Sequence, residues 1–313
     1  YARALQFEAK WSLAADVYET VISHTDAETD PDLAISAHMA LGACLRVLAR
    51  WREAMQSYAV AGLVAEGIGD VMGVLRARIA EANLAMARGN LPRAEMLLDA
   101  TIASSMASPG LMEVRAIALQ DRGIVARQRG DLDRAISFTY AALQSFEDQV
   151  AKDRALADLA AIFYDIGLLS AAREANLMLA ATAQEQYTRW VAVINLLEIA
   201  AFDGREPVFE QYKRELGEAN LPPILSAYYN FYVGQGYRML GNLDLARPAL
   251  ERAMEVATRH DVNEVIIKAE QSLQEIAKGS RIAARVENVT PSADVVKVAD
   301  AVHEMRTLAG VAG

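Results

Sequence analysis

The sequence predicts an all-α protein, a right-handed α-solenoid of about seven helix pairs with a capping helix and a C-terminal tail helix. Two observations lead to this fold class. The 313 residues include only 18 glycines and 8 prolines, which are too few turn formers for a many-stranded sandwich or barrel. In addition, one turn signal recurs along the chain at a nearly constant interval, which is typical of stacked structural repeats.

Each copy of the signal contains a turn residue, an apolar or aromatic residue two positions later, and a small residue three positions beyond that. The copy at residues 89–94 reads Gly-Asn-Leu-Pro-Arg-Ala. Successive copies are 37 to 41 residues apart, and the residues at the small position, which we call the anchors, are Ala14, Ala54, Ala94, Ala135, Ala172, Phe209 and Ala246. Seven copies at such regular spacing predict a repeat array.

The residue types within each copy suit two helices joined by a tight turn. A glycine such as Gly89 permits the positive φ that ends the first helix, and the Asn or Asp that follows caps the second. The small anchor lets the two helices approach closely, so we expect the alanine anchors to be buried where helices cross. Phe209 takes this place in the sixth copy, where we expect a local distortion.

Several copies resemble the tetratricopeptide repeat family. The likeness is carried by Leu41-Gly42, Leu45, Trp51, Ala54, Tyr58 and Ala61, by Gly123, Gly130, Leu132, Ala135 and Ala142, and most clearly by residues 230–253. It covers roughly residues 1–277, and its period is longer than the usual 34 residues of the family. Long arrays of this kind are similar to the repeat domains of large bacterial signal-responsive regulators. The resemblance implies that one face of each first helix lines a concave groove.

The apolar spacing places helices at residues 1–9, 11–24, 31–49, 51–67, 70–88, 91–105, 109–129, 131–148, 150–166, 168–183, 186–202, 206–217, 223–239, 243–260 and 262–277. The last of these would close the array. We therefore expect a repeat domain over 1–278, followed over 279–313 by a linker and an amphipathic helix at 291–308. That helix would either dock on the solenoid or lead towards another module. Since position 1 is Tyr, we expect the natural chain to begin earlier.

The charge and the cysteine content exclude several classes of function. The net charge is −10 and the pI is about 5.0, without a basic cluster, so neither nucleic acid nor an anionic membrane is an expected partner. A single cysteine, Cys44, permits neither an intrachain disulfide nor a cysteine zinc site. No secretory signal opens the chain, and we expect a cytoplasmic protein.

The sequence offers little catalytic chemistry, so we expect no enzyme activity, no cofactor and no metal. None of the four histidines has a second ligand at metal spacing, and no phosphate-binding loop or nucleophile elbow is present. The string from His303 to Leu308 resembles the phospho-acceptor box of sensor histidine kinases, but it lacks the proline that follows the threonine in that family. We therefore favour an exposed histidine on an amphipathic helix. A helical-repeat enzyme is the remaining catalytic alternative.

The expected groove is the best candidate for a binding site. Matching the copies to the family pattern gives the groove residues Arg46, Arg76, Asn83, Gln120, Arg127, Arg154, Tyr164, Glu198, Tyr228, Phe231, Gln235 and Arg238. Five arginines in this set would create a locally positive face, and the guanidinium group suits carboxylates. The alternative is that these arginines pair with acidic residues of adjacent helices.

The leading hypothesis is a non-catalytic scaffold that binds a protein or peptide segment in the groove, with an acidic segment or a C-terminal carboxylate favoured. The alternative is the sensory or regulatory repeat region of a larger bacterial signalling protein whose output domain lies outside this chain. A homodimer formed through the end helices remains open.

Overall fold

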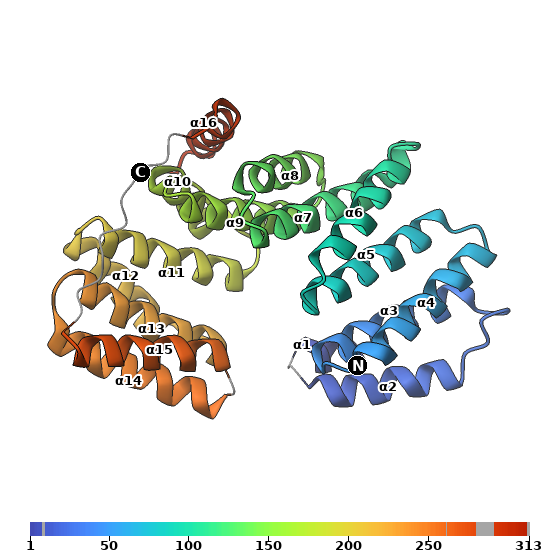
Figure 1. Cartoon of the computed structure of the whole chain (residues 1–313), viewed down its shortest axis with the longest axis horizontal. Coiled ribbons are helices and arrows are strands. Elements are labelled where there is room, and N and C mark those ends of the chain that lie inside the picture. Colours follow the sequence, from blue (N-terminus) through green and yellow to red (C-terminus); the bar gives the residue numbers. More distant parts are fainter. Residues whose placement is uncertain (8–9, 261, 280–290, 312–313) are drawn as a thin grey trace. The chain divides into compact units, whose positions relative to one another are not determined.

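The computed structural model describes residues 1–7, 10–260, 262–279 and 291–311, and within these ranges it contains α-helices, one 3₁₀ turn and no strand (Figure 1). The all-α prediction is therefore confirmed. The helices are α1 (Ala2–Phe7), α2 (Trp11–Ser23), α3 (Pro31–Val47), α4 (Trp51–Gly67), α5 (Val71–Ala87), α6 (Leu91–Ser105), α7 (Met112–Gln128), α8 (Leu132–Ser145), α9 (Gln149–Asp165), α10 (Leu169–Thr182), α11 (Gln186–Phe202), α12 (Glu206–Glu218), α13 (Pro223–Met239), α14 (Leu243–Arg259), α15 (Asn263–Ala277) and α16 (Ala293–Leu308).

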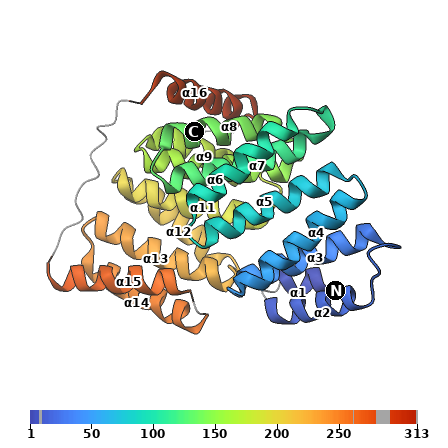
Figure 2. The ribbon, with the colours of Figure 1, turned by 45° about the vertical axis from the view of Figure 1, so that its right-hand side comes forward.

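The chain forms two compact units, Tyr1–Glu147 and Asp148–Gly313, which we call unit 1 and unit 2. Unit 1 contains α1 to α8, and unit 2 contains α9 to α16. In each unit, most helices that follow one another in the chain pack as antiparallel neighbours, as in a helical solenoid (Figure 1 and Figure 2). The sequence-based division at residue 278 stays a prediction.

The first helices of successive pairs also contact one another within each unit. In unit 1, α5 contacts both α3 and α7, and in unit 2, α11 contacts α9 and α13, while α13 contacts α15. These contacts place side chains from neighbouring first helices on a shared surface. The residues that the repeat pattern assigns to the groove are on these first helices.

The turns behave largely as the repeat signal predicts. Gly89, Gly130, Gly167, Gly204 and Gly241, each five residues before an anchor, all have positive φ. In the second copy this position is Ala49, whose φ of 57° is the one positive value at a non-glycine residue in the described ranges.

Side-chain capping follows the prediction in some copies only. The side chains of Asn90 and Asp131 accept hydrogen bonds from Arg93 N and Arg134 N, at 3.2 and 3.4 Å. The expected cap at Asn242 is wrong, because its side chain makes no cap hydrogen bond and donates instead to Glu206 at 3.4 Å.

The anchors lie at helix crossings, which confirms the repeat register. All seven, including Phe209, are 0% exposed. A second small position on the facing helix accommodates larger side chains, since Gly42 lies under the ring of Tyr58 and Gly234 lies against Leu250. Such contacts hold the two helices of a pair close together.

The sixth pair departs from the regular pattern, as the Phe209 anchor predicts. α11 packs against both α12 and α13, whereas the backbones of α12 and α13 approach each other at few positions and large side chains fill the space between them. The ring of Phe209 meets Tyr237 edge to face, with centroids 5.2 Å apart, and lies directly over Gly236. A bulky anchor is thus accommodated by a glycine on the next helix.

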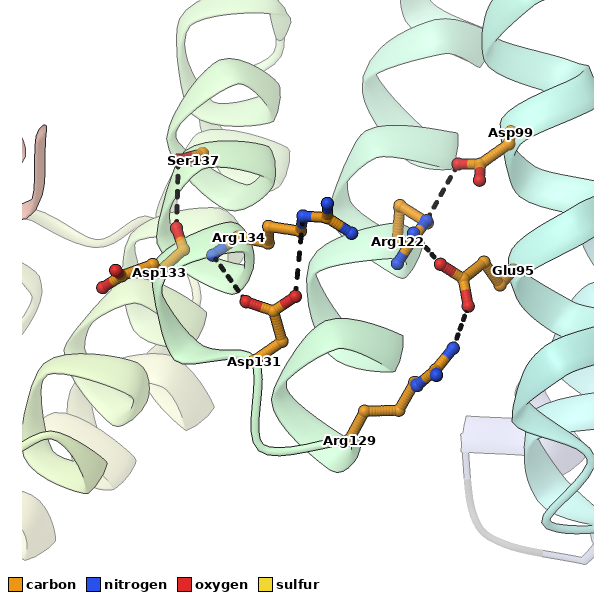
Figure 3. A network of polar contacts seen from close by, with 8 residues as sticks. All are labelled: Glu95, Asp99, Arg122, Arg129, Asp131, Asp133, Arg134 and Ser137. Carbon is orange, nitrogen blue, oxygen red and sulfur yellow. Dashed lines mark hydrogen bonds and ion pairs between the residues drawn. The ribbon is translucent and has the colours of Figure 1, made fainter.

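A polar network joins the third and fourth pairs of unit 1 (Figure 3). Arg122 on α7 donates from Nε to Oδ1 of Asp99 at 2.8 Å and pairs with Glu95, both on α6. Glu95 also pairs with Arg129. The Arg122 side chain is 5% exposed and its guanidinium lies 4.9 Å from the centroid of the Phe138 ring. A charge buried to this extent is tolerated because it is paired.

The tail helix α16 packs on α10, so of the two alternatives for this helix, docking on the repeat array is observed (Figure 1). Its buried face contains Val295, Val298 and Val302. Arg306 pairs with Glu174 of α10, and His303 Nδ1 lies 3.5 Å from the same carboxylate. His303 is therefore an exposed residue of a docked helix.

No helix in the described part of the chain is both long and apolar enough to cross a membrane.

Candidate interaction surfaces

One group of predicted groove residues comes from three first helices of unit 1 that contact in sequence, and we call this group the arginine surface. Its members are Arg46 on α3, Arg76 and Asn83 on α5, and Gln120 and Arg127 on α7. Arg76 NH2 lies 3.5 Å from Glu113 of α7, with side-chain exposures of 47% and 65%. An exposed ion pair at this distance contributes little stability, so the Arg76 guanidinium can exchange Glu113 for another carboxylate.

The other members of the arginine surface are half-buried. Arg46 hydrogen-bonds the hydroxyl of Tyr58, and burial raises the pKa of Tyr58 while Arg46 partly offsets this rise. The apolar side chains Met39, Met86 and Ile117, on the same three helices, are half-buried and pack against the core clusters of the unit. The three helices therefore contribute both polar donors and partly buried apolar side chains.

Two of the predicted groove residues of the seventh pair, Gln235 and Arg238, contact α15 instead of lining an open groove. Arg238 NH2 donates to Oε2 of Glu275 at 2.9 Å, and the Arg238 side chain is 3% exposed. Gln235 donates to Ser272 at 2.6 Å. Arg238 is thus paired and enclosed within unit 2, and the expectation that it offers an accessible guanidinium is wrong.

Phe231 is also enclosed, at 6% exposure, within the core cluster of unit 2. Arg154 pairs with Glu185 at 3.0 Å, and both side chains are substantially exposed. Tyr164 and Glu198 are half-buried. In unit 2 the predicted set is therefore divided between packing and accessible positions.

Spacing in the sequence could have revealed the partners of the seventh pair. Tyr228 and Glu264 are 36 residues apart, and both Gln235 with Ser272 and Arg238 with Glu275 are 37 apart. These separations equal one repeat, because α15 occupies the place of a first helix in a further copy. The sequence analysis treated residues 262–277 as a cap and did not align them with the repeat.

A separate shallow depression of about 680 Å³ lies along α12, where this helix diverges from α13. Its lining includes Lys213, which donates to the Tyr237 hydroxyl at 2.5 Å and pairs with Glu210. Burial disfavours the charged ammonium of Lys213, but the hydrogen bonds to Glu210 and Tyr237 outweigh this effect and raise the pKa of Lys213. These contacts connect α12 to α13 and account for the cluster structurally.

Among the described residues, no three His, Cys, Asp or Glu side chains gather as metal ligands would. Cys44 is fully buried in the core of unit 1, as its position beside Gly42 predicts.

Comparisons with known proteins support the fold. No family model matches the sequence, and the search of curated proteins finds no match either. The apo form of the quorum sensor NprR from B. thuringiensis matches over 80% of this chain and 73% of its own, with a TM-score of 0.60 and 12% identity. At this identity the likeness concerns the fold alone, and it is consistent with a helical-repeat protein.

Two further solved structures match with TM-scores below 0.5. BtubC (BKLC) from P. vanneervenii is 16% identical, with 81% of this chain and 90% of that chain covered and a TM-score of 0.45. A structure of Naa15/Naa10 bound to HypK-THB is 15% identical over 98% of this chain and 49% of the matched one, with a TM-score of 0.33.

Proposed function

We propose that the chain is a non-catalytic scaffold of the tetratricopeptide-repeat type that binds a peptide or protein segment on the arginine surface. The observation that carries this proposal is the placement of Arg46, Arg76 and Arg127 on three first helices that contact in sequence, α3 to α5 and α5 to α7. Adjacent first helices that contribute polar donors and partly buried apolar side chains suit an extended or helical peptide.

The preferred ligand group is a carboxylate, either a C terminus or an acidic side chain. A guanidinium offers paired donors that match carboxylate geometry, and Asn83 supplies amide donors seven residues from Arg76 on the same helix. Arg76 lies beside the carboxylate of Glu113, which is the kind of group that we propose for the ligand.

The test uses fluorescein-labelled acidic peptides in matched forms, one with a free C-terminal carboxylate and one amidated. We expect the carboxylate form to bind more tightly, with an affinity that falls as salt rises, because exposed charges are screened. Arg76→Ala and Arg127→Ala should each weaken binding by about 1.5–3 kcal/mol if a charged hydrogen bond is lost.

Arg78→Ala is the matched control, since Arg78 is on the same helix but contacts Ser104 of α6. Binding that does not distinguish the two peptide forms, or that survives the Arg76→Ala and Arg127→Ala double variant unchanged, would count against the proposal. Circular dichroism of each variant checks that the helices remain folded.

A second candidate is a regulatory role within a larger bacterial signalling protein. Two observations favour it: the docking of α16 on α10, and the fold likeness to NprR, which is a quorum sensor. A gene that continues beyond Gly313 into an output domain would support this role, and peptide binding would then serve as its input.

A further inference from the structure

Arg76 on the arginine surface already has a carboxylate beside it. Its NH2 atom lies 3.5 Å from Oε1 of Glu113, which is on the neighbouring first helix α7. Arg46 differs, because it hydrogen-bonds the hydroxyl of Tyr58, which is a neutral group. A ligand carboxylate that approaches Arg76 must therefore compete with Glu113.

The fold keeps Glu113 within reach of Arg76. Glu113 lies in the first turn of α7, where the helix dipole stabilises an acidic side chain. Since α5 and α7 contact each other, the carboxylate and the guanidinium belong to two packed helices of the same unit. A group attached in this way acts at an effective concentration in about the millimolar range. Glu113 thus has an advantage over a dilute ligand.

The pair between Arg76 and Glu113 is nevertheless weak enough to be displaced. Its N–O distance of 3.5 Å is longer than the roughly 2.7–2.9 Å of a charge-assisted hydrogen bond. The two side chains are 47% and 65% exposed, and ion pairs exposed to this degree contribute little stability. The Glu113 side chain can therefore rotate into solvent without a change in the backbone.

We propose that Glu113 is a built-in competitor for Arg76 that sets the affinity threshold of the arginine surface, an inference that rests on the proposed peptide-binding function. A ligand carboxylate at Arg76 replaces one that is already present, so this contact alone adds little to the free energy of binding. A ligand must therefore make further contacts on the surface in order to bind.

Asn83 is the group best placed to provide such a contact. Its half-buried side chain is seven residues from Arg76 on α5, and seven residues of helix span about 10 Å. About three extended residues of a ligand cover this distance. The class of partner is therefore a peptide segment with a polar group about three residues from its carboxylate, and an isolated carboxylate falls below the threshold.

Glu113→Gln in the full chain tests the proposal, because it removes the charge and keeps the size of the side chain. The probe is the labelled acidic peptide with a free C-terminal carboxylate. We expect the variant to bind it about two- to fivefold more tightly, since an exposed ion pair no longer opposes binding. The affinity should also fall more steeply with salt, because binding then creates an ion pair instead of exchanging one.

Two controls distinguish competition at Arg76 from a general loss of negative charge. Glu66→Gln removes the same charge from an exposed position on the second helix α4, and it should leave the affinity unchanged. In the Arg76→Ala background, Glu113→Gln should have no effect, because the group for which it competes is absent. Circular dichroism confirms that each variant is folded.

An unchanged affinity in Glu113→Gln, an equal gain in Glu66→Gln, or a gain that persists with Arg76→Ala would overturn the proposal. If the parent chain binds the peptide, Arg76→Ala weakens binding and Glu113→Gln has no effect, the scaffold function stands and only the competitor is wrong. If neither the parent chain nor Glu113→Gln binds the peptide, the proposed binding surface is wrong as well.

Discussion

Single residues set the geometry of each repeat, and the turn position five residues before each anchor shows how. Glycine occupies it in the five copies from Gly89 to Gly241, always with positive φ. A side chain with a Cβ is strained there, because Cβ approaches the backbone carbonyl in the left-handed region. Ala49 adopts this conformation without the freedom of glycine, so the second copy contains local strain.

Ala49→Gly is expected to stabilise the protein by about 0.5–1 kcal/mol, the relief of left-handed strain less the greater entropy of glycine in the unfolded chain. The reciprocal change, Gly89→Ala, should destabilise by about 1 kcal/mol. Urea unfolding of both variants against the parent chain measures these differences. Opposite signs would show that the turn conformation does not govern stability at this position.

Gly236 shows a second single-residue constraint, imposed by packing. A Cβ at this position would collide with the Phe209 ring, which is itself fully buried. Phe209 is the one anchor that is not alanine, so the two positions form a compensating pair between α12 and α13.

Gly236→Ala should therefore cost about 1–3 kcal/mol through overpacking, despite the better helix propensity of alanine. Gly62→Ala is the control, since a Cβ there would meet only Ala77 Cβ, at an ordinary 3.4 Å, and should be neutral or stabilising. Thermal unfolding distinguishes the two. Adding Phe209→Leu to Gly236→Ala should recover part of the lost stability. If the double variant is no more stable than Gly236→Ala alone, the collision with the Phe209 ring is not the cause of the loss.

Individual helices were largely predictable from the sequence, and their pairwise contacts were only partly so. The periodic apolar residues and turn glycines located each helix, because both act locally within a repeat. The ion pairs between helices depend on side chains a whole repeat apart, such as Arg238 and Glu275. The helical periodicity predicts the face of the helix on which a side chain lies, but not whether a neighbouring helix covers that face. For this reason the sequence predicts Arg238 in an open groove, whereas α15 covers it.

Arg122 provides the element-scale prediction, since it connects α6 to α7 while 5% exposed. Arg122→Met should destabilise unit 1 by about 2–3 kcal/mol, because charged hydrogen bonds are lost and Glu95 loses one of its two arginine partners. Arg129→Met is the matched control, as Arg129 is 49% exposed and pairs with the same carboxylate.

The control should cost less than about 1 kcal/mol, as exposed ion pairs do. Urea unfolding, with the midpoint and slope compared for each variant, measures the difference. If both substitutions have the same small effect, the network shown in Figure 3 does not stabilise the junction between the third and fourth pairs.

At the scale of the whole molecule, the repeat determines which surfaces are available for binding. In each unit the first helices contact one another, so residues at one repeat position accumulate on one surface. The sequence predicts that Arg76 and Asn83 share such a surface, because seven residues on α5 correspond to about two helical turns. It did not locate the carboxylate partner of Tyr228, since Glu264 belongs to another helix.

The central claim, that the first helices of unit 1 form the binding surface, is tested most directly by methionine oxidation footprinting. Met39 and Met86 are on first helices, whereas Met55 and Met96, at 47% and 51% exposure, are on second helices. The tightest-binding free-carboxylate peptide should slow the oxidation of Met39 and Met86 and leave the rates at Met55 and Met96 unchanged. Protection of Met55 and Met96 alone, or equal protection by the amidated peptide, would contradict the claim.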